Sequence, residues 1–130
     1  MPVPSLDRIL FVEDDPDIQS IARLSLVAVG KFTVEICGSG AAALEKAPQF
    51  IPDLILLDVM MPGMDGPGTL MALRQMPETA NIPVIFMTAK VQTHEVAYYK
   101  ELGALDVIAK PFEPMTLPTT IRTLWQQFYG

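Results

Sequence analysis

The chain has 130 residues, enough for a single domain that buries a hydrophobic core without disulfides or structural metal. Half of its residues are hydrophobic and only 18% are charged, which excludes a disordered tail. Acidic residues outnumber Lys and Arg by 15 to 9, and the formal net charge of −6 argues against nucleic acid as a partner, because phosphates attract cations.

Neither a secretory signal nor a membrane span is evident. The N-terminus lacks a basic region followed by an apolar core, and no apolar run approaches the ~20 residues that cross a bilayer. The single cysteine, Cys37, excludes a disulfide framework and is typical of a reducing compartment. We therefore expect a cytoplasmic protein, with one domain over residues 1–130 and no membrane contact.

Five short apolar runs recur at even intervals and predict five β-strands. They cover residues 9–12, 32–37, 54–57, 84–87 and 107–109. Four of them are nearly continuous, which is typical of strands buried on both faces of a parallel sheet. The second run alternates apolar with polar residues and predicts a half-exposed edge strand.

Segments with helical spacing lie between these runs and after the last one. The predicted helices cover about 15–30, 39–47, 65–75, 92–102 and 114–128. Capping side chains begin the first three, and Pro48 ends the second. Pro118 fits the last helix only within its first turn. The alternation of strands and helices predicts an α/β fold, a doubly wound five-stranded parallel sheet with five helices on its two faces.

Polar side chains gather where the predicted strands end, which is where open parallel sheets bind ligands. Glu13 and Asp14 follow the first strand, Asp58 the third, Thr88 the fourth and Lys110 the fifth. Because like charges repel at close range, three carboxylates on one rim require a cation. Their hard oxygens match Mg²⁺, with Mn²⁺ as the alternative.

A carboxylate that ends a buried strand beside a metal ion and a lysine can attack phosphorus, forming an aspartyl phosphate. The metal ion and Lys110 would balance charge on the equatorial oxygens of the transferring phosphoryl group. The Thr88 hydroxyl would donate a hydrogen bond to one of those oxygens. Residue types and topology thus point to phosphoryl transfer.

These motifs resemble those of CheY-like receiver domains, the phosphorylated domains of two-component response regulators. The matching segments are Val12–Asp15, Leu56–Gly66, Met87–Ala89, Gly103–Ala104 and Lys110–Phe112. They occur in the family's order and at its spacing, and the resemblance covers about residues 8–128.

The resemblance implies that Asp58 accepts a phosphoryl group from a phosphohistidine on a histidine kinase or a phosphotransfer protein. It also implies how the metal is held: Asp14 and Asp58 ligate it directly, Glu13 helps through water, and Met60 supplies its backbone carbonyl. The fold implied by the family is the doubly wound, flavodoxin-like sheet expected above.

The resemblance further implies that Thr88 and Lys110 bind the phosphoryl group and that Thr88 moves on phosphorylation. The peptide bond between Lys110 and Pro111 is expected to be cis. One position departs from the family pattern, since Val107 stands where a Tyr or Phe usually switches with the threonine. A ring flip at this position is therefore not expected.

The family's usual docking face is formed by the last two predicted helices and the strand between them. We expect an unidentified downstream protein to bind there. Tyr98 or Tyr99 is a candidate anchor, because one of two adjacent helical residues must point sideways or outward.

Two positions near the site tune phosphate lifetime in such domains, here Met60 and Lys90. Neither offers a carboxylate or an amide to orient an attacking water. We therefore predict slow self-dephosphorylation.

Two other interpretations remain open. A degenerate receiver would serve only as a protein-interaction scaffold, although the intact Asp14, Asp58, Thr88 and Lys110 argue against it. An aspartate-nucleophile phosphatase would carry Asp-x-Asp after its first strand, where this chain has Glu-Asp-Asp. We therefore expect a regulatory phosphoacceptor rather than an enzyme.

Overall fold

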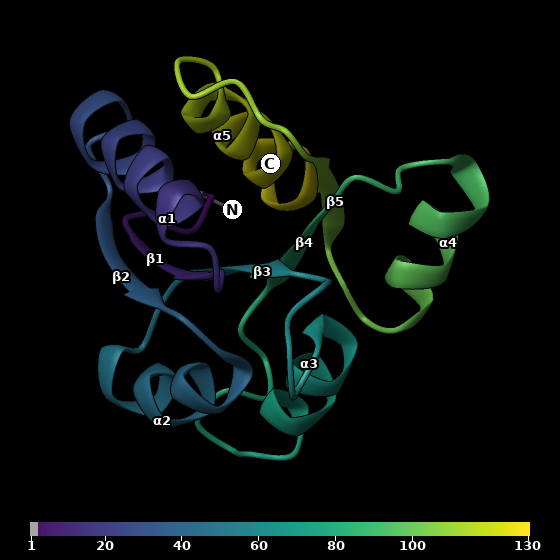
Figure 1. Cartoon of the computed structure of the whole chain (residues 1–130). Coiled ribbons are helices and arrows are strands. Elements are labelled where there is room, and N and C mark those ends of the chain that lie inside the picture. The colour runs from purple at the N-terminus through teal and green to yellow at the C-terminus, as the bar shows by residue number, and fades with distance from the viewer. Residues whose placement is uncertain (1–2) are drawn as a thin grey trace.

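A computed structural model describes residues 3–130 and contains one parallel sheet of five strands, in the order β2-β1-β3-β4-β5 (Figure 1). The strands are β1 (Arg8–Val12), β2 (Thr33–Cys37), β3 (Leu54–Asp58), β4 (Val84–Thr88) and β5 (Asp106–Ala109). Because all four neighbouring pairs are parallel, every strand ends at the same edge of the sheet.

Each strand is followed by helical structure. The helices are α1 (Pro16–Arg23), which continues as a π-helical segment (Leu24–Val29), then α2 (Gly40–Phe50), α3 (Gly66–Arg74), α4 (Thr93–Glu101) and α5 (Leu117–Tyr129). In Figure 1, α1 and α5 cover one face of the sheet, α2 and α3 cover the other, and α4 lies beyond β5. The predicted fold class is confirmed. None of the helices described over residues 3–130 is long and apolar enough to cross a membrane.

The core has two layers because successive side chains of each strand point to opposite faces. Leu10, Leu57 and Phe86 pack on the side of α2 and α3, whereas Phe11 and Leu56 pack on the side of α1 and α5. The central strands β1, β3 and β4 are almost entirely buried, as their continuous apolar runs predict. The carboxyl ends of β1 and β3 are thereby held rigidly in the middle of the sheet.

Two local expectations are wrong. The fifth strand was predicted to be buried on both faces, but β5 is an edge strand in which Val107 is half-buried and Ala109 is exposed. The second helix was predicted to stop before Pro48, but α2 includes this residue and ends at Phe50. A proline near the helix end removes only one backbone donor, and Ile51 then closes the helix in the left-handed conformation at φ 52°. Pro118 does lie in the first turn of α5, as expected.

Candidate functional site

Three carboxylates meet where β1 and β3 end. Glu13 and Asp14 directly follow β1, and Asp58 is the last residue of the neighbouring strand β3. One carboxylate oxygen from each residue lies within 4.8 Å of the other two. Glu13 and Asp58 are buried and Asp14 is exposed, so the cluster faces solvent on the Asp14 side. This set of hard oxygens fits a hard divalent cation.

Lys110, which follows β5, reaches across β4 to both buried carboxylates. Its Nζ lies 2.8 Å from Oε1 of Glu13 and 3.2 Å from Oδ1 of Asp58. Burial raises the pKa of Glu13, although the hydrogen bond from Lys110 acts in the opposite direction. Burial would lower the pKa of Lys110, but the hydrogen bond to Glu13 and the charge of Asp58 outweigh it and raise this pKa, which keeps the lysine protonated. A single lysine ammonium faces three carboxylates, so the cluster keeps an excess of negative charge. This excess favours the binding of a metal cation.

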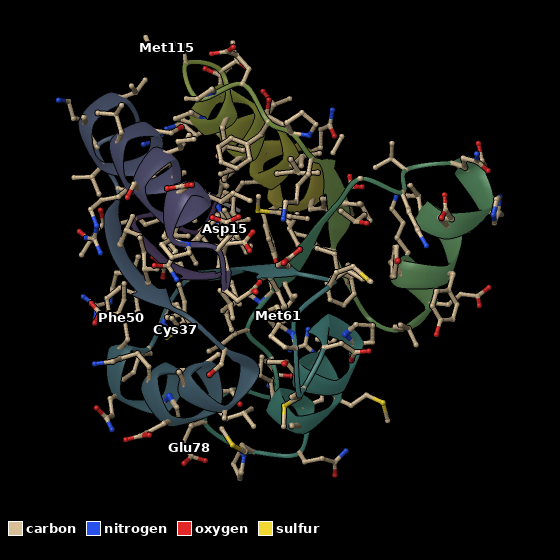
Figure 2. All side chains as sticks on the ribbon, in the orientation of Figure 1. Asp15, Cys37, Phe50, Met61, Glu78 and Met115 are labelled. Carbon is tan, nitrogen blue, oxygen red and sulfur yellow. The ribbon has the colours of Figure 1, made fainter. Side chains whose placement is uncertain are left out.

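The turn after β1 orients Glu13. The backbone N–H of Asp15 donates to Glu13 Oε2 at 3.2 Å, and Gln19 Nε2 donates to the Glu13 carbonyl oxygen at 2.6 Å. Asp15, seen at the start of α1 in Figure 2, accepts the backbone N–H groups of Asp17 at 2.8 Å and Ile18 at 3.4 Å. Asp15 therefore caps α1, and its own N–H, together with the Gln19 side chain, holds Glu13 in place.

Gly66 allows the N-terminus of α3 to pack directly on the strand end that carries Asp58. A Cβ at this position would lie 2.6 Å from the Asp58 carbonyl oxygen and 2.8 Å from Val59 Cα, so any side chain would displace the backbone. The Gly66 N–H also donates to the Val59 carbonyl at 2.9 Å. Gly66 is part of the motif identified in the sequence, but its contact is with backbone atoms, which no side-chain pattern reveals.

Thr88 ends β4 beside this site and is 3% exposed. The residue before it, Met87, pairs with Asp58 in the sheet register. The Thr88 Oγ1 accepts the backbone N–H of Lys90 at 3.1 Å, and the Lys110 N–H donates to the Thr88 carbonyl at 2.9 Å. The bond between Lys110 and Pro111 is cis, as the resemblance implied. All five residues expected at the strand ends thus lie along one edge.

The remaining candidate residues have different surroundings. Met60, two residues after Asp58, has a side chain that is 70% exposed. Val107 is half-buried in β5. Tyr98 is 54% exposed, whereas Tyr99 is only 8% exposed and packs in the core. Of the two tyrosines considered as surface anchors, only Tyr98 is therefore available to a partner.

Comparisons with known proteins agree with this geometry. The model of the family "Response regulator receiver domain" matches residues 9–122. The DNA-binding response regulator MtrA of Mycolicibacterium smegmatis is 37% identical over 115 residues, which are 88% of this chain and 49% of that protein. The transcriptional regulatory protein CseB of Streptomyces coelicolor is 36% identical over 121 residues, 93% of this chain and 50% of that protein. The chain thus spans about half the length of these curated relatives.

Solved structures show the same fold. The chemotaxis response regulator CheY4 of Vibrio cholerae superposes with a TM-score of 0.83 at 29% identity, over 92% of this chain and 99% of that one. A putative response regulator from Chloroflexus aurantiacus has a TM-score of 0.81 at 31% identity, over 94% of this chain and 99% of that one.

These relatives contradict one expectation about partners. The acidic composition argued against nucleic acid, yet MtrA is a DNA-binding response regulator and CseB a transcriptional regulatory protein. The net charge describes only the stretch of sequence over which it is summed, and here that stretch spans half of each relative. Excluding nucleic acid on this ground was therefore wrong.

The family match covers most of the chain, and the structure joins its motif residues at one edge of a receiver-like sheet. The chain belongs to the response regulator receiver domain family of two-component systems.

Proposed function

We propose that the protein is a phosphorylation-dependent switch in which Asp58 accepts a phosphoryl group from a phosphohistidine donor. One observation carries the proposal: the buried Asp58 carboxylate lies 3.2 Å from the ammonium of Lys110 and within 4.8 Å of two further carboxylates. A carboxylate that needs only structural pairing would be satisfied by the lysine alone. The additional acids are expensive to place there unless a metal and an anionic group are bound.

We propose Mg²⁺ as the metal, with Mn²⁺ as the alternative. Asp14 and Asp58 would hold it through carboxylate oxygens, Met60 through its backbone carbonyl, and Glu13 through a water molecule. The bound ion would neutralise negative charge on the phosphoryl group and on the attacking carboxylate. The burial of Glu13 and Asp58, together with the exposure of Asp14, supports this assignment, because the ion would enter from the solvent side.

The side chains divide the rest of the chemistry between them. An Asp58 oxygen attacks phosphorus in line with the nitrogen of the donor histidine, and the phosphorus–nitrogen bond breaks as the aspartyl phosphate forms. Lys110 neutralises charge on one phosphoryl oxygen, and Thr88 donates a hydrogen bond to another. Thr88 ends β4, which lies next to β3, and Lys110 follows β5, which lies on the other side of β4. The spacing of the strands therefore sets the distances of both residues from Asp58.

We further propose that the domain acts as a regulator rather than as an enzyme, with residues 8–128 as one functional unit in the cytoplasm. The donor would be a histidine kinase or a histidine phosphotransfer protein. The output would pass to a downstream protein through the face formed by α4, β5 and α5, on which Tyr98 is 54% exposed.

The direct test is covalent modification. The protein is incubated with Mg²⁺ and a small phosphodonor such as acetyl phosphate, and its intact mass is measured. We expect one added phosphate in the wild type, none in Asp58→Asn, and none when the metal is chelated. An unchanged adduct in Asp58→Asn would overturn the assignment. A scaffold without phosphoacceptor activity would show no adduct, and a phosphatase would instead release phosphate continuously from simple esters.

A further inference from the structure

The segment before β1 is docked on the last turns of α5. Residues 3–7 belong to no strand or helix. The Trp125 Nε1–H donates to the Pro4 carbonyl oxygen at 2.7 Å, and Val3 and Leu6 pack against the core cluster that contains Trp125. The end of α5 therefore already binds a proline-containing segment of the same chain.

An aromatic pair forms the α5 side of this contact. The rings of Trp125 and Tyr129, one helical turn apart, have centroids 4.5 Å apart and an interplanar angle of 46°. Trp125 is 7% exposed, and a buried indole N–H needs an acceptor. Aromatic grooves bind proline-rich segments because these are already extended and lose little conformational entropy on binding. Val3 shares this tendency, since the residue before a proline favours an extended backbone.

A cavity of about 400 Å³ adjoins the docked segment. Trp125 and Tyr129 line it on the α5 side, and Pro4 and Ser5 form another wall. Three further prolines line it: Pro52, Pro77 and Pro83. Because proline has a fixed φ and no backbone N–H, these walls are stiff and offer carbonyl acceptors. A longer proline-containing segment that replaced residues 3–6 would extend into this space.

The cavity is acidic and lies at the edge of the sheet opposite Asp58. Asp53 and Pro83 directly precede β3 and β4, so the cavity lies at the amino ends of these strands. Among the described residues that line it, Asp53 and Glu78 carry carboxylates and none carries a cation. A segment with lysine or arginine beside its prolines therefore complements the cavity in charge.

We propose that the Trp125–Tyr129 surface is a docking site for an extended, proline-containing and basic segment of a partner protein, and that residues 3–6 cover this site when no partner is bound. A carbonyl of the partner would accept the indole N–H of Trp125 in place of Pro4. Since residues 3–6 are tethered next to the site, they compete at high effective concentration and lower the affinity for the partner. The inference concerns the edge opposite Asp58 and does not depend on its phosphorylation.

Tryptophan fluorescence tests this proposal, because Trp125 is the only tryptophan of the chain and reports on this surface alone. The probe is the synthetic peptide Ac-Lys-Pro-Pro-Val-Pro-Pro-Leu-NH2, and its control has every proline replaced by alanine. Both are titrated into the full chain and into a variant without residues 2–6. Circular dichroism verifies folding. Val3→Gly with Pro4→Gly, which weakens the segment without removing it, takes the place of the deletion if that variant does not fold.

In the deletion variant we expect the Trp125 emission to move to longer wavelength, because the indole loses its cover, and to move back when the proline peptide binds. The peptide should bind this variant at least about fivefold more tightly than the full chain. Tyr129→Leu in the deletion variant should weaken binding several-fold. Tyr98→Leu, on the exposed surface of α4, is the matched control and should leave binding unchanged.

Four results would be decisive against the proposal. An emission that responds to neither peptide would show that the surface binds no such segment. Equal binding of the alanine peptide would show that proline is not recognised. Equal affinities of the full chain and the deletion variant would show that residues 3–6 do not cover the site. An emission that varies with protein concentration, together with a dimer in sedimentation, would assign the surface to a second copy of the chain.

Discussion

The site at the end of β1 and β3 and the region of α4 and β5 are built in opposite ways. Glu13 and Asp58 extend from strands whose residues are almost all buried, and Lys110 is bound to both acids. α4 contributes a single buried side chain, and β5 is an edge strand. Elements with few buried contacts open at lower free energy than the core. The acidic site is thus held by a tightly packed part of the sheet, whereas α4 and β5 are held by fewer buried contacts and can move more easily.

Removing the lysine from the rigid region should have the largest effect. Lys110→Met leaves two buried carboxylates without their cation, and we expect the free energy of unfolding in metal-free buffer to fall by about 3 kcal/mol. Added Mg²⁺ should recover part of this loss, because it supplies positive charge to the same oxygens. Urea denaturation with and without Mg²⁺ measures both effects.

Lys100, in the region of α4 and β5, provides the control. Lys100 lies 3.7 Å from Asp106, and its side chain is 47% exposed. Lys100→Met should change the free energy of unfolding by less than about 0.5 kcal/mol. Equal losses in the two variants would show that the buried pairing of Lys110 contributes nothing beyond an ordinary surface ion pair.

The next prediction concerns the backbone under Asp58. Gly66→Ala places a methyl group 2.6 Å from the Asp58 carbonyl oxygen, and overpacking of this kind costs about 1–3 kcal/mol. If Asp58 is phosphorylated as proposed, the variant should also form the phosphate adduct more slowly, since the strand end that carries Asp58 must shift. Gly38→Ala is the control, because its Cβ would meet only Gln19 Nε2 at 3.5 Å, an ordinary contact. A stable and fully reactive Gly66→Ala would contradict the close packing of α3 on the site.

Hydrogen exchange should show the contrast in the unmodified protein. The amides of α4 are expected to exchange about tenfold or more faster than those of α3, which buries Leu70 and Leu73 on the same side of the sheet. Mass spectrometry of peptides over Thr93–Glu101 and Gly66–Arg74 measures both rates. Similar protection of the two helices would remove the basis for treating α4 as the responsive element.

The same contrast explains how far sequence reasoning succeeded. Continuous apolar runs identify the buried strands, and parallel βα repeats bring strand ends to one edge. These two patterns predict that Glu13, Asp58 and Lys110 lie close together, and the ion pairs of Lys110 confirm this proximity. The prediction succeeded because burial and topology act through many residues at once.

Features that depend on a single contact were not predictable in this way. Residues 107–109 of β5 are apolar like those of a central strand, and only the strand order shows β5 to be an edge. The adjacent Tyr98 and Tyr99 are chemically identical, so their opposite exposures follow from how α4 is rotated on the sheet. The requirement for glycine at residue 66 arises from carbonyl atoms of another segment. The net charge wrongly excluded nucleic acid as a partner, because it is a sum over these 130 residues only.

The smallest expected effect is on the rate at which phosphate is lost from Asp58, with the packing of the buried acids unchanged. Met60 is 70% exposed and Lys90 is also exposed, so their replacement leaves the buried acids and Lys110 in place. Met60→Asn with Lys90→Glu introduces an amide and a carboxylate that can orient a water molecule toward the aspartyl phosphate. We expect the phosphate on Asp58 to be lost several-fold faster, as followed by intact mass in the presence of Mg²⁺.

Met71→Asn is the matched control for this change. Met71 is 62% exposed on α3 and offers the same substitution on a helix rather than in the loop after Asp58. It should leave the phosphate lifetime unchanged and lower the free energy of unfolding by no more than about 0.7 kcal/mol, since Asn favours a helix less than Met does. If the double variant loses phosphate no faster than this control, water is not oriented from these positions. The buried residues around Asp58 would then determine the lifetime of the aspartyl phosphate. The exposed positions 60 and 90 would have to be counted with the surroundings that do not affect it.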